Sequence, residues 1–510
     1  MGAPFPYTEA LIGACFVHPP FEHQLRDFEG HAESPARAKA WTMRTGKSKA
    51  EIDRACHNFL RGRIDGVLIF APNGVHANWV EREFPAHAWP GVNWSGLVWR
   101  STESGSKGFA KLRKADQAEW HERREAWWKR LAAVRQDRGL MVLAVNSESM
   151  TRADVRKAVA RFIKHRRVFV IFDESDDFGT PGTKRTKMAR ALARRCAMRS
   201  ILSGTMLTGS PLAAFSQFEL LEKAALGFET FEDFKNHFAE YELERGRGGR
   251  RYPKLTGFKN LEELRERMAP FVSVVRREDC KDMPELVCSV RKITPSAQQL
   301  AAYRELHHDF MIDVANGRVS VGERAPRFQK MQQVFSGFVI DESRKVVWLP
   351  GPNPRLAALR EEMYLAPGKV IIWCQFQADI DAVTKQSLAD GYKVVAYHGR
   401  VSDKAKQIAL NLFREDRSVK ALVGHMQSGG RGVDMSAASK IIVYSHTFKA
   451  RLREQAKERA TKIGGGNVQL VDFQSPGPDA RILQVTESRV NVADFLTGAG
   501  MQEFLKGIAL

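Results

Sequence analysis

Residues 40–48 read Ala-Trp-Thr-Met-Arg-Thr-Gly-Lys-Ser, and the organisation of the chain follows from this stretch. Its last four residues, Thr45, Gly46, Lys47 and Ser48, have the pattern of a loop whose backbone N–H groups, at a helix N-terminus, surround phosphate. In such a loop Lys47 reaches the outer phosphates and the Ser48 hydroxyl ligates Mg²⁺. Gly-Lys-Ser also occurs in ordinary surface turns, so the interpretation depends on the rest of the chain.

Length and composition indicate a soluble protein with two domains. The 510 residues exceed one ordinary core, and 79 Lys and Arg against 59 Asp and Glu leave a net charge of +20. This excess favours a polyanionic partner, although a merely basic protein has the same balance. The six cysteines include no Cys-x-x-Cys pair, which argues against structural zinc and disulfides. Without a secretion signal or an apolar run of about 18 residues, we expect no membrane contact and a cytoplasmic location.

Short apolar runs alternate with helical patterns from residue 20 onward, which predicts an α/β fold of parallel sheets flanked by helices. The run 168–172 is the clearest buried strand, and Asp173 and Glu174 follow it directly. Two carboxylates at such a tip need a cation, and Mg²⁺ on nucleotide phosphates is the natural one. We therefore expect Asp173 to hold Mg²⁺ and Glu174 to orient the attacking water. A helix N-cap would explain one acid but not both.

Two further positions fit the same nucleotide site. Gln24 precedes the phosphate loop by about twenty residues, and its amide suits the adenine edge because it donates and accepts together. The predicted short strand 200–205 closes on the polar tip Ser203, Gly204 and Thr205, whose hydroxyls are placed to sense the γ-phosphate. A surface glutamine and an ordinary turn are the alternatives.

A basic helix is predicted over residues 111–130, where seven Lys or Arg are interleaved with Trp120, Trp127 and Trp128. Charge and aromatic rings together suit nucleic acid. The same spacing also places the tryptophans on one core-facing stripe beneath a solvated basic face, which is the interpretation we favour.

An ordered series of these motifs resembles the first motor lobe of superfamily-two helicases of the Swi/Snf-related group. The series consists of Gln24, Thr45-Gly46-Lys47-Ser48, Asn78-Trp79, Asp173-Glu174 and Ser203-Gly204-Thr205. Segments 268–271, 276–277, 283–285 and 294–303 resemble the shared tail that follows in this group. The resemblance runs in order over nearly the whole chain.

The resemblance implies two RecA-like lobes, residues 1–283 and residues 284–510, with helical insertions at about 226–270 and about 296–345. It also implies ATP and Mg²⁺ as cofactors and DNA, duplex or branched, as the partner. Loop 245–251 in the first insertion carries four arginines among glycines, which suits phosphate contact as well as a solvated tip.

In the second lobe, residues 427–434 resemble the group's fifth motif, where glycines let the backbone approach DNA phosphate and nucleotide together. This implies nucleotide contacts by Gly432 and Asp434. The nucleic-acid contacts that the resemblance implies are Asn78, Trp79, His398, Gly429 and Gly430.

Residues 455–464 resemble the sixth motif, with Gln455, Arg459 and Lys462 at positions i, i+4 and i+7 of a predicted helix. These positions share one face, so all three side chains are expected at the nucleotide. An amphipathic surface helix has the same spacing. Arg44, in the nucleotide-binding loop where the group has glycine, and Lys462, where it has a second arginine finger, depart from the pattern. Because lysine lacks the planar fork of arginine, these departures are compatible with weak turnover or with an altered dependence on the partner lobe.

We therefore expect a two-lobed, ATP-driven translocase on DNA, with duplex DNA favoured, of a compact bacterial or phage type that acts in the cytoplasm of the cell or host. A strand-separating helicase in replication, recombination or repair is the alternative among enzymes. A nucleic-acid-binding protein switched by nucleotide, with weak or no hydrolysis, is the alternative of another class, and Arg44 and Lys462 favour it.

Overall fold

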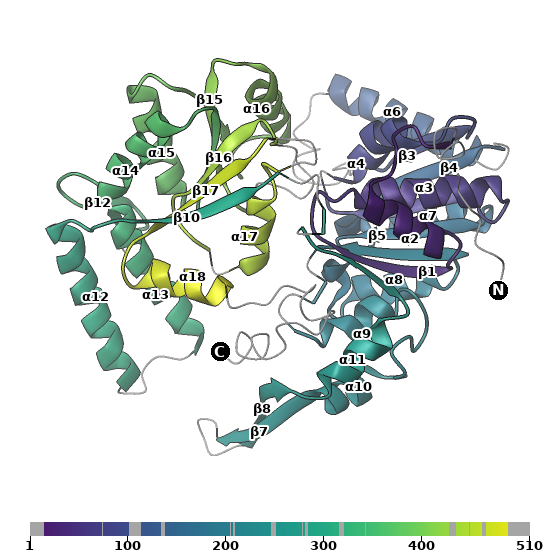
Figure 1. The fold of residues 1–510 in the computed structure, drawn as a ribbon, viewed down its shortest axis with the longest axis horizontal. Coiled ribbons are helices and arrows are strands. Elements are labelled where there is room, and N and C mark those ends of the chain that lie inside the picture. Colours follow the sequence, from purple (N-terminus) through teal and green to yellow (C-terminus); the bar gives the residue numbers. More distant parts are fainter. Residues whose placement is uncertain are drawn as a thin grey trace. The chain divides into compact units, whose positions relative to one another are not determined.

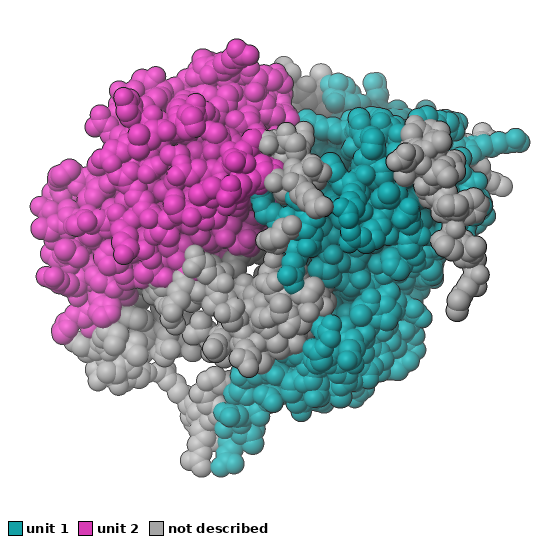
Figure 2. All heavy atoms as spheres, in the orientation of Figure 1, with its two compact units in different colours: residues 1–281, 490–510 teal, residues 282–489 magenta. Residues whose placement is uncertain are grey.

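A computed structural model describes most of the chain as two compact units. The described residues are 15–73, 75–100, 114–133, 138–204, 206–207, 210–245, 251–277, 279–280, 284–315, 321–341, 343–427, 435–447, 449–461 and 466–487. Contacts divide them at residues 281 and 282, close to the expected lobe boundary at 283 and 284 (Figure 2).

The first unit is built on a parallel sheet. Its described strands form a seven-stranded sheet in the order β3-β4-β2-β5-β6-β1-β9, and each neighbouring pair is parallel (Figure 1). The strands are β1 (Ala36–Trp41), β2 (Gly66–Ala71), β3 (Trp94–Val98), β4 (Leu140–Asn146), β5 (Val168–Asp173), β6 (Met198–Ser203) and β9 (Val272–Val275). Parallel neighbours need crossover connections, which here are largely helical. The predicted α/β class is confirmed.

Helices cover both faces of this sheet because side chains alternate along each strand. In β2, Leu68 and Phe70 join one apolar cluster, while Val67 and Ile69 join a second on the other face. Around the sheet lie α2 (Glu22–His31), α3 (Lys47–Leu60), α4 (His76–Asn78), the π-helix η1 (Trp79–Glu83), α5 (Phe84–His87), α6 (Lys114–Ala133), the 3₁₀ turns η3 (Ser147–Ser149) and η4 (Ser175–Phe178), α7 (Ala153–Lys164), α8 (Lys184–Ala193) and α9 (Ala213–Phe218).

Helix α6 is the predicted basic helix, and two of its three tryptophans face the core. Trp127 and Trp128 pack against the first apolar cluster, and the Trp127 indole N–H donates to the Val98 carbonyl at 2.9 Å. Trp120 lies beneath the Arg124 guanidinium. The core-facing interpretation is confirmed for Trp127 and Trp128.

The predicted helical insertion at 226–270 is wrong in its middle. Two helices, α10 (Phe231–Phe238) and α11 (Leu261–Met268), flank an antiparallel hairpin of β7 (Ala239–Arg245) and β8 (Arg251–Phe258). Glutamate has a high helix propensity, but the glutamates of β7 stand at every second position, which is the period of a strand. Pairing with β8 stabilises the strand over the helix. Residues 246–250 of the arginine-rich loop 245–251 lie outside the described residues, so its contact with phosphate stays a prediction.

The second unit has its own parallel sheet. Its described strands are ordered β10-β17-β16-β13-β15-β14, and each pair is parallel. The strands are β10 (Leu286–Lys292), β13 (Lys369–Cys374), β14 (Lys393–Tyr397), β15 (Val419–His425), β16 (Ala438–Val443) and β17 (Val468–Gln474). Helices α14 (Pro354–Leu365), α15 (Gln377–Ala389), α16 (Asp403–Glu415), α17 (Ala450–Lys457) and α18 (Pro478–Glu487) surround them.

Helices also make up most of the segment expected as the second insertion. It contains α12 (Ala297–Ala315), α13 (Val321–Ser336) and the short hairpin strands β11 (Phe338–Ile340) and β12 (Val346–Trp348). No helix in the described ranges has the length and apolar character needed to cross a bilayer.

Candidate nucleotide site

The phosphate loop connects β1 to α3 and depends on two left-handed residues. Gly46, directly before α3, has φ +79°, and Arg44 has φ +67°. Glycine adopts this region without strain, whereas an arginine there costs about 1 kcal/mol or more. The left-handed backbone explains why the resembled group has glycine at this position, and Arg44 adopts the same conformation at an energetic cost.

Lys47 closes the loop onto itself. Its ammonium donates to the Trp41 carbonyl at 2.8 Å and to the Thr42 carbonyl at 3.2 Å. The buried Thr45 hydroxyl also donates to the Thr42 carbonyl, at 2.7 Å. Lys47 must therefore exchange carbonyl oxygens for phosphate oxygens when a nucleotide binds.

Gln24 supports this loop from α2. Its amide nitrogen lies 3.3 Å from the Thr45 carbonyl and 3.2 Å from the Gly46 carbonyl, and its oxygen accepts from the Phe21 N–H at 3.0 Å. A Cβ on Gly46 would come within 2.1 Å of the Gln24 amide nitrogen, so this contact requires glycine. Both ends of the amide are engaged, and its contact with adenine stays a prediction.

His23 is a loop partner that the sequence analysis missed. Its Nε2 lies 2.8 Å from the Thr45 carbonyl, and its ring packs edge-on against Trp41. Burial lowers the pKa of His23, so the neutral ring donates to the carbonyl. Its place next to Gln24 was the only available signal, because a single histidine on a helix has no motif of its own.

Asp173 and Glu174 end β5 with an unusual electrostatic environment. Glu174 is buried and has a left-handed backbone at φ +53°. Burial raises the pKa of Asp173 from 3.8 to about 6, the Glu174 charge adds to this, and the Trp79 N–H and the Lys47 ammonium oppose it. A strained, carboxylate-rich strand tip is the arrangement expected of a functional site.

These residues fit a magnesium ion shared with nucleotide phosphates. No group of three or more His, Cys, Asp or Glu side chains suited to a metal occurs among the described residues. Mg²⁺ commonly takes only one or two protein ligands and completes its shell with phosphate oxygens and water. Burial and the Glu174 charge raise the pKa of Asp173 although the Lys47 ammonium lowers it, so a bound cation would further stabilise the ionised carboxylate. Ser48, half-buried in the first turn of α3, offers the hydroxyl.

The sheet itself brings the motifs of the first unit together. Strands β5, β6 and β1 are adjacent and parallel, so the loop after β1, Asp173 and Ser203 lie at one edge. The Ser203 hydroxyl is 3.5 Å from an Asp176 carboxylate oxygen. A Cβ on Gly204 would lie 3.4 Å from the Trp41 carbonyl and 3.2 Å from the Met43 side chain. Thr205 lies outside the described residues.

Trp79 is buried next to Asp173. Its side chain is 1% exposed, and its indole N–H donates to Asp173 Oδ2 at 3.1 Å. A buried ring has no face on which a base could stack, whereas the neighbouring Asn78 is partly exposed. The nucleic-acid contacts of Asn78 and Trp79 stay predictions. The apolar part of the Trp79 ring packs in the core, and its N–H contacts Asp173 of the candidate nucleotide site.

The predicted helix through Gln455, Arg459 and Lys462 ends early. Helix α17 stops at Lys457, and the Arg459 carbonyl accepts from the Met435 N–H at 3.3 Å. The Thr461 hydroxyl binds the Glu458 carbonyl at 3.2 Å, which closes the turn after the helix. Gln455 and Arg459 are buried at 4% exposure, and Lys462 lies outside the described residues. Helical spacing therefore does not relate Arg459 to Gln455.

Most residues of the predicted fifth motif lie outside the part of the chain that the structure describes. Gly429, Gly430, Gly432 and Asp434 lie outside the described residues, so their roles stay predictions. His398 directly follows β14 and is partly exposed, and burial lowers the pKa of its imidazole.

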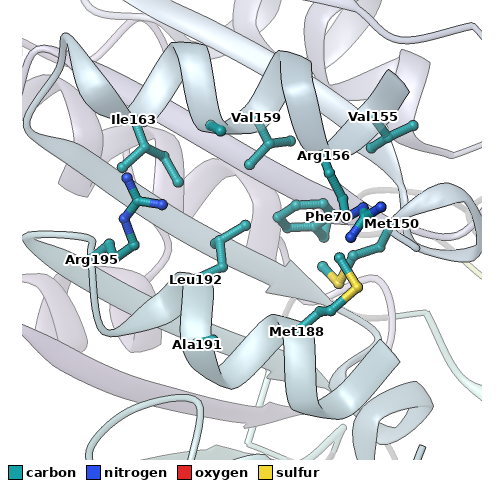
Figure 3. Close-up of a pocket in the computed structure, with 11 residues that line it drawn as sticks. Phe70, Met150, Val155, Arg156, Val159, Ile163, Met188, Ala191, Leu192 and Arg195 are labelled. Carbon is teal, nitrogen blue, oxygen red and sulfur yellow. The ribbon is translucent and has the colours of Figure 1, made fainter. Parts of the chain in front are cut away.

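A separate cavity of about 270 Å³ lies between α7 and α8 (Figure 3). Val155, Val159 and Leu192 line it, Phe70 lies behind them, and Arg156 and Arg195 stand at its sides. Its apolar lining belongs to the face of the sheet opposite α3, so it is not the nucleotide site.

Together, the parallel sheet, the phosphate loop and the paired carboxylates at a neighbouring strand tip define an ATP-hydrolysing motor of the helicase-like class. Residues 25–338 match the SNF2-related domain, which is more than half of the chain, and residues 354–464 match the helicase conserved C-terminal domain. The chain therefore belongs to the SNF2-related family.

Curated relatives share stretches of similar sequence with the chain. The chain is 24% identical over 345 residues to the TATA-binding protein-associated factor mot1 of Aspergillus fumigatus, covering 58% of this chain and 18% of that protein. It is 22% identical over 295 residues to the mouse DNA annealing helicase and endonuclease ZRANB3, covering 58% and 26%. The chain thus spans only about a fifth to a quarter of the length of these relatives. The Sulfolobus solfataricus SWI2/SNF2 ATPase core in complex with dsDNA aligns with a TM-score of 0.39 and 17% identity over 97% of this chain and 94% of that one.

Proposed function

We propose that this chain is an ATP-driven motor that translocates along DNA, with duplex DNA favoured. The observation that carries the proposal is the meeting of the phosphate loop and Asp173 at one sheet edge, with Lys47 close enough to lower the pKa of Asp173. The net charge of +20 supports a nucleic-acid partner. Two relatives are named for DNA annealing and for association with the TATA-binding protein, which supports action on DNA-bound structures.

The residues of the first unit have distinct proposed roles in hydrolysis. Lys47 binds the outer phosphates after releasing the Trp41 and Thr42 carbonyls. Ser48 and Asp173 would hold Mg²⁺, which neutralises phosphate charge when bound. Glu174 orients the attacking water, and its fixed left-handed backbone keeps that carboxylate beside Asp173. In the second unit, Arg459 is proposed to meet the charge that develops on the γ-phosphate.

The proposal is tested by phosphate release from the purified chain without DNA and with single-stranded, duplex or branched DNA. We expect duplex DNA to stimulate turnover, Lys47→Ala to abolish it, and Lys187→Ala, an exposed change on α8, to leave it unchanged. Binding of DNA and ATP without any hydrolysis would instead support the nucleotide-switched alternative. Separation of a forked duplex without displacement of a triplex strand would support the strand-separating helicase.

A further inference from the structure

Two donors fix the Asp173 carboxylate in the first unit. The Trp79 indole N–H donates to Oδ2 at 3.1 Å, and the Glu174 backbone N–H donates to Oδ1 at 3.1 Å. Each oxygen therefore has one partner, and rotation of the carboxylate would break at least one hydrogen bond. The donors leave further lone pairs on both oxygens for another ligand.

The Trp79 ring is held rigidly enough to orient its partner. Its side chain is among the largest fully buried ones, and it packs in the second apolar cluster with Ile69 and Phe84. Trp79 is also the first residue of η1, and the wide turn of a π-helix is frequent at functional sites. A buried aromatic ring with one polar atom can place that atom with little rotational freedom.

We propose that Trp79 is a positioning residue for hydrolysis, because its indole N–H holds the Asp173 carboxylate in the orientation that binds the divalent metal. This inference rests on the proposed nucleotide site. Hydrogen bonds from outside the ligand shell commonly fix metal-binding side chains, and their loss commonly weakens metal binding about 10–100-fold. The role differs from the DNA contact that the Asn78-Trp79 motif suggests from sequence.

The same unit contains a matched control. The Trp89 indole N–H donates to Asp53 Oδ1 at 2.9 Å, and Trp89 is 4% exposed in the same apolar cluster. Asp53 lies within α3 and is paired with Lys49 at 2.7 Å. Trp89→Phe therefore removes the same kind of hydrogen bond from a buried aspartate that has no part in the proposed site.

The test compares the wild type, Trp79→Phe and Trp89→Phe as full chains. Binding of Mn²⁺ to each protein saturated with ADP is measured by electron paramagnetic resonance, and nucleotide affinity is measured separately in EDTA. We expect Trp79→Phe to weaken Mn²⁺ binding about tenfold with unchanged affinity for metal-free ADP. Trp89→Phe should match the wild type in both measurements.

Steady-state hydrolysis gives a second measurement. For Trp79→Phe the Mg²⁺ concentration at half-maximal rate should rise by the same factor as the Mn²⁺ dissociation constant, with most of kcat regained at saturating Mg²⁺. Equal Mn²⁺ affinities for Trp79→Phe and Trp89→Phe would overturn the proposal. If Trp79→Phe does not fold, β-(3-benzothienyl)alanine at position 79 keeps the ring shape without the N–H and gives the same decision.

The outcomes separate this inference from the proposed function. A wild type that binds Mn²⁺ with ADP but does not hydrolyse ATP refutes the motor and leaves the Mn²⁺ comparison valid. A wild type that hydrolyses ATP while Trp79→Phe binds Mn²⁺ normally refutes only the positioning role. Failure of the wild type to bind Mn²⁺ with ADP refutes both.

Discussion

Asp173→Asn is expected to stabilise the nucleotide-free protein in EDTA at neutral pH, although it should abolish hydrolysis. The pKa of Asp173 rises from 3.8 to about 6 on folding, and this shift corresponds to about 3 kcal/mol of unfavourable ionisation at 1.36 kcal/mol per pKa unit. Asparagine has one acceptor oxygen for the two donors, Trp79 and Glu174, so about 1 kcal/mol is lost again. Because Asp173 is only half-buried, solvent screening lowers the gain further, to about 1–2 kcal/mol.

The pH dependence follows from the raised pKa. Between pH 4 and pH 6 the folded wild type binds more protons at Asp173 than the unfolded chain, so its stability falls as the pH rises through this window. Asp173→Asn lacks this loss. Its advantage should therefore be full above about pH 6 and disappear below about pH 4.

A control of opposite sign lies on α2. Burial alone would raise the pKa of Asp27, but ion pairs with Lys39 and Arg37 hold it well below its usual range. The ionised Asp27 therefore stabilises the fold above the unfolded pKa, and this stability is lost as the pH falls below about 4. Asp27→Asn should be destabilising at pH 7, because it leaves the Lys39 ammonium, with 0% exposure, without one partner.

Thermal unfolding of the three proteins in EDTA from pH 4 to pH 8 decides the matter. A change of 1 kcal/mol moves Tm by about 2–4 °C in a domain of this size, so we expect Asp173→Asn to raise Tm by about 2–8 °C at pH 7.5. An unchanged or lower Tm for Asp173→Asn, with Asp27→Asn behaving as described, would refute the inference that the ionised Asp173 carboxylate destabilises the metal-free protein.

Four further predictions concern the loop, the second unit and the partner. Lys47→Ala should abolish phosphate release with little change in Tm, because it removes the cation at the outer phosphates and little core packing; normal turnover would exclude Lys47 from catalysis. Arg44→Gly should stabilise the protein by up to about 1 kcal/mol in urea unfolding because φ is +67° there, whereas Arg61→Gly, at φ −77°, should destabilise it. Arg459→Ala should cost far more turnover than Lys462→Ala at saturating ATP and DNA, since an arginine finger contributes about 10³–10⁵ in rate; parental turnover in Arg459→Ala would contradict the role of the second unit. DNA affinity should fall linearly in log K against log[salt], with little sequence preference, and a flat dependence in a titration would argue against phosphate contacts.

Local sequence patterns were sufficient for the sheet and for the main parts of the site. The apolar run 168–172, which two acids follow, predicted strand β5 with Asp173 at its end, and the run 369–374 predicted strand β13. These features depend on apolar continuity and on residues adjacent in the chain. The Gly-Lys-Ser pattern likewise placed the left-handed Gly46 directly before α3.

Patterns of charge were less decisive where two periodicities coexisted. The glutamates of β7 suit a helix as well as a strand, and pairing with β8 across the turn selected the hairpin. The sequence predicted one helix through Gln455 and Arg459. Helix α17 instead ends at Lys457, and the Arg459 carbonyl accepts a hydrogen bond from the Met435 N–H, 24 residues earlier in the chain.

The sequence by itself determined the motor class, the phosphate loop and the acidic strand tip, because adjacent residues encode each of them. Only the tertiary structure decided how these parts are held. Trp79 and Asp173 are 94 residues apart, and they meet because β2 and β5 are neighbours in the sheet and the segment after β2 returns across its carboxyl edge. Burial then removed the tryptophan from the surface and turned its N–H toward the carboxylate, a contact that depends on chain topology rather than on any local pattern.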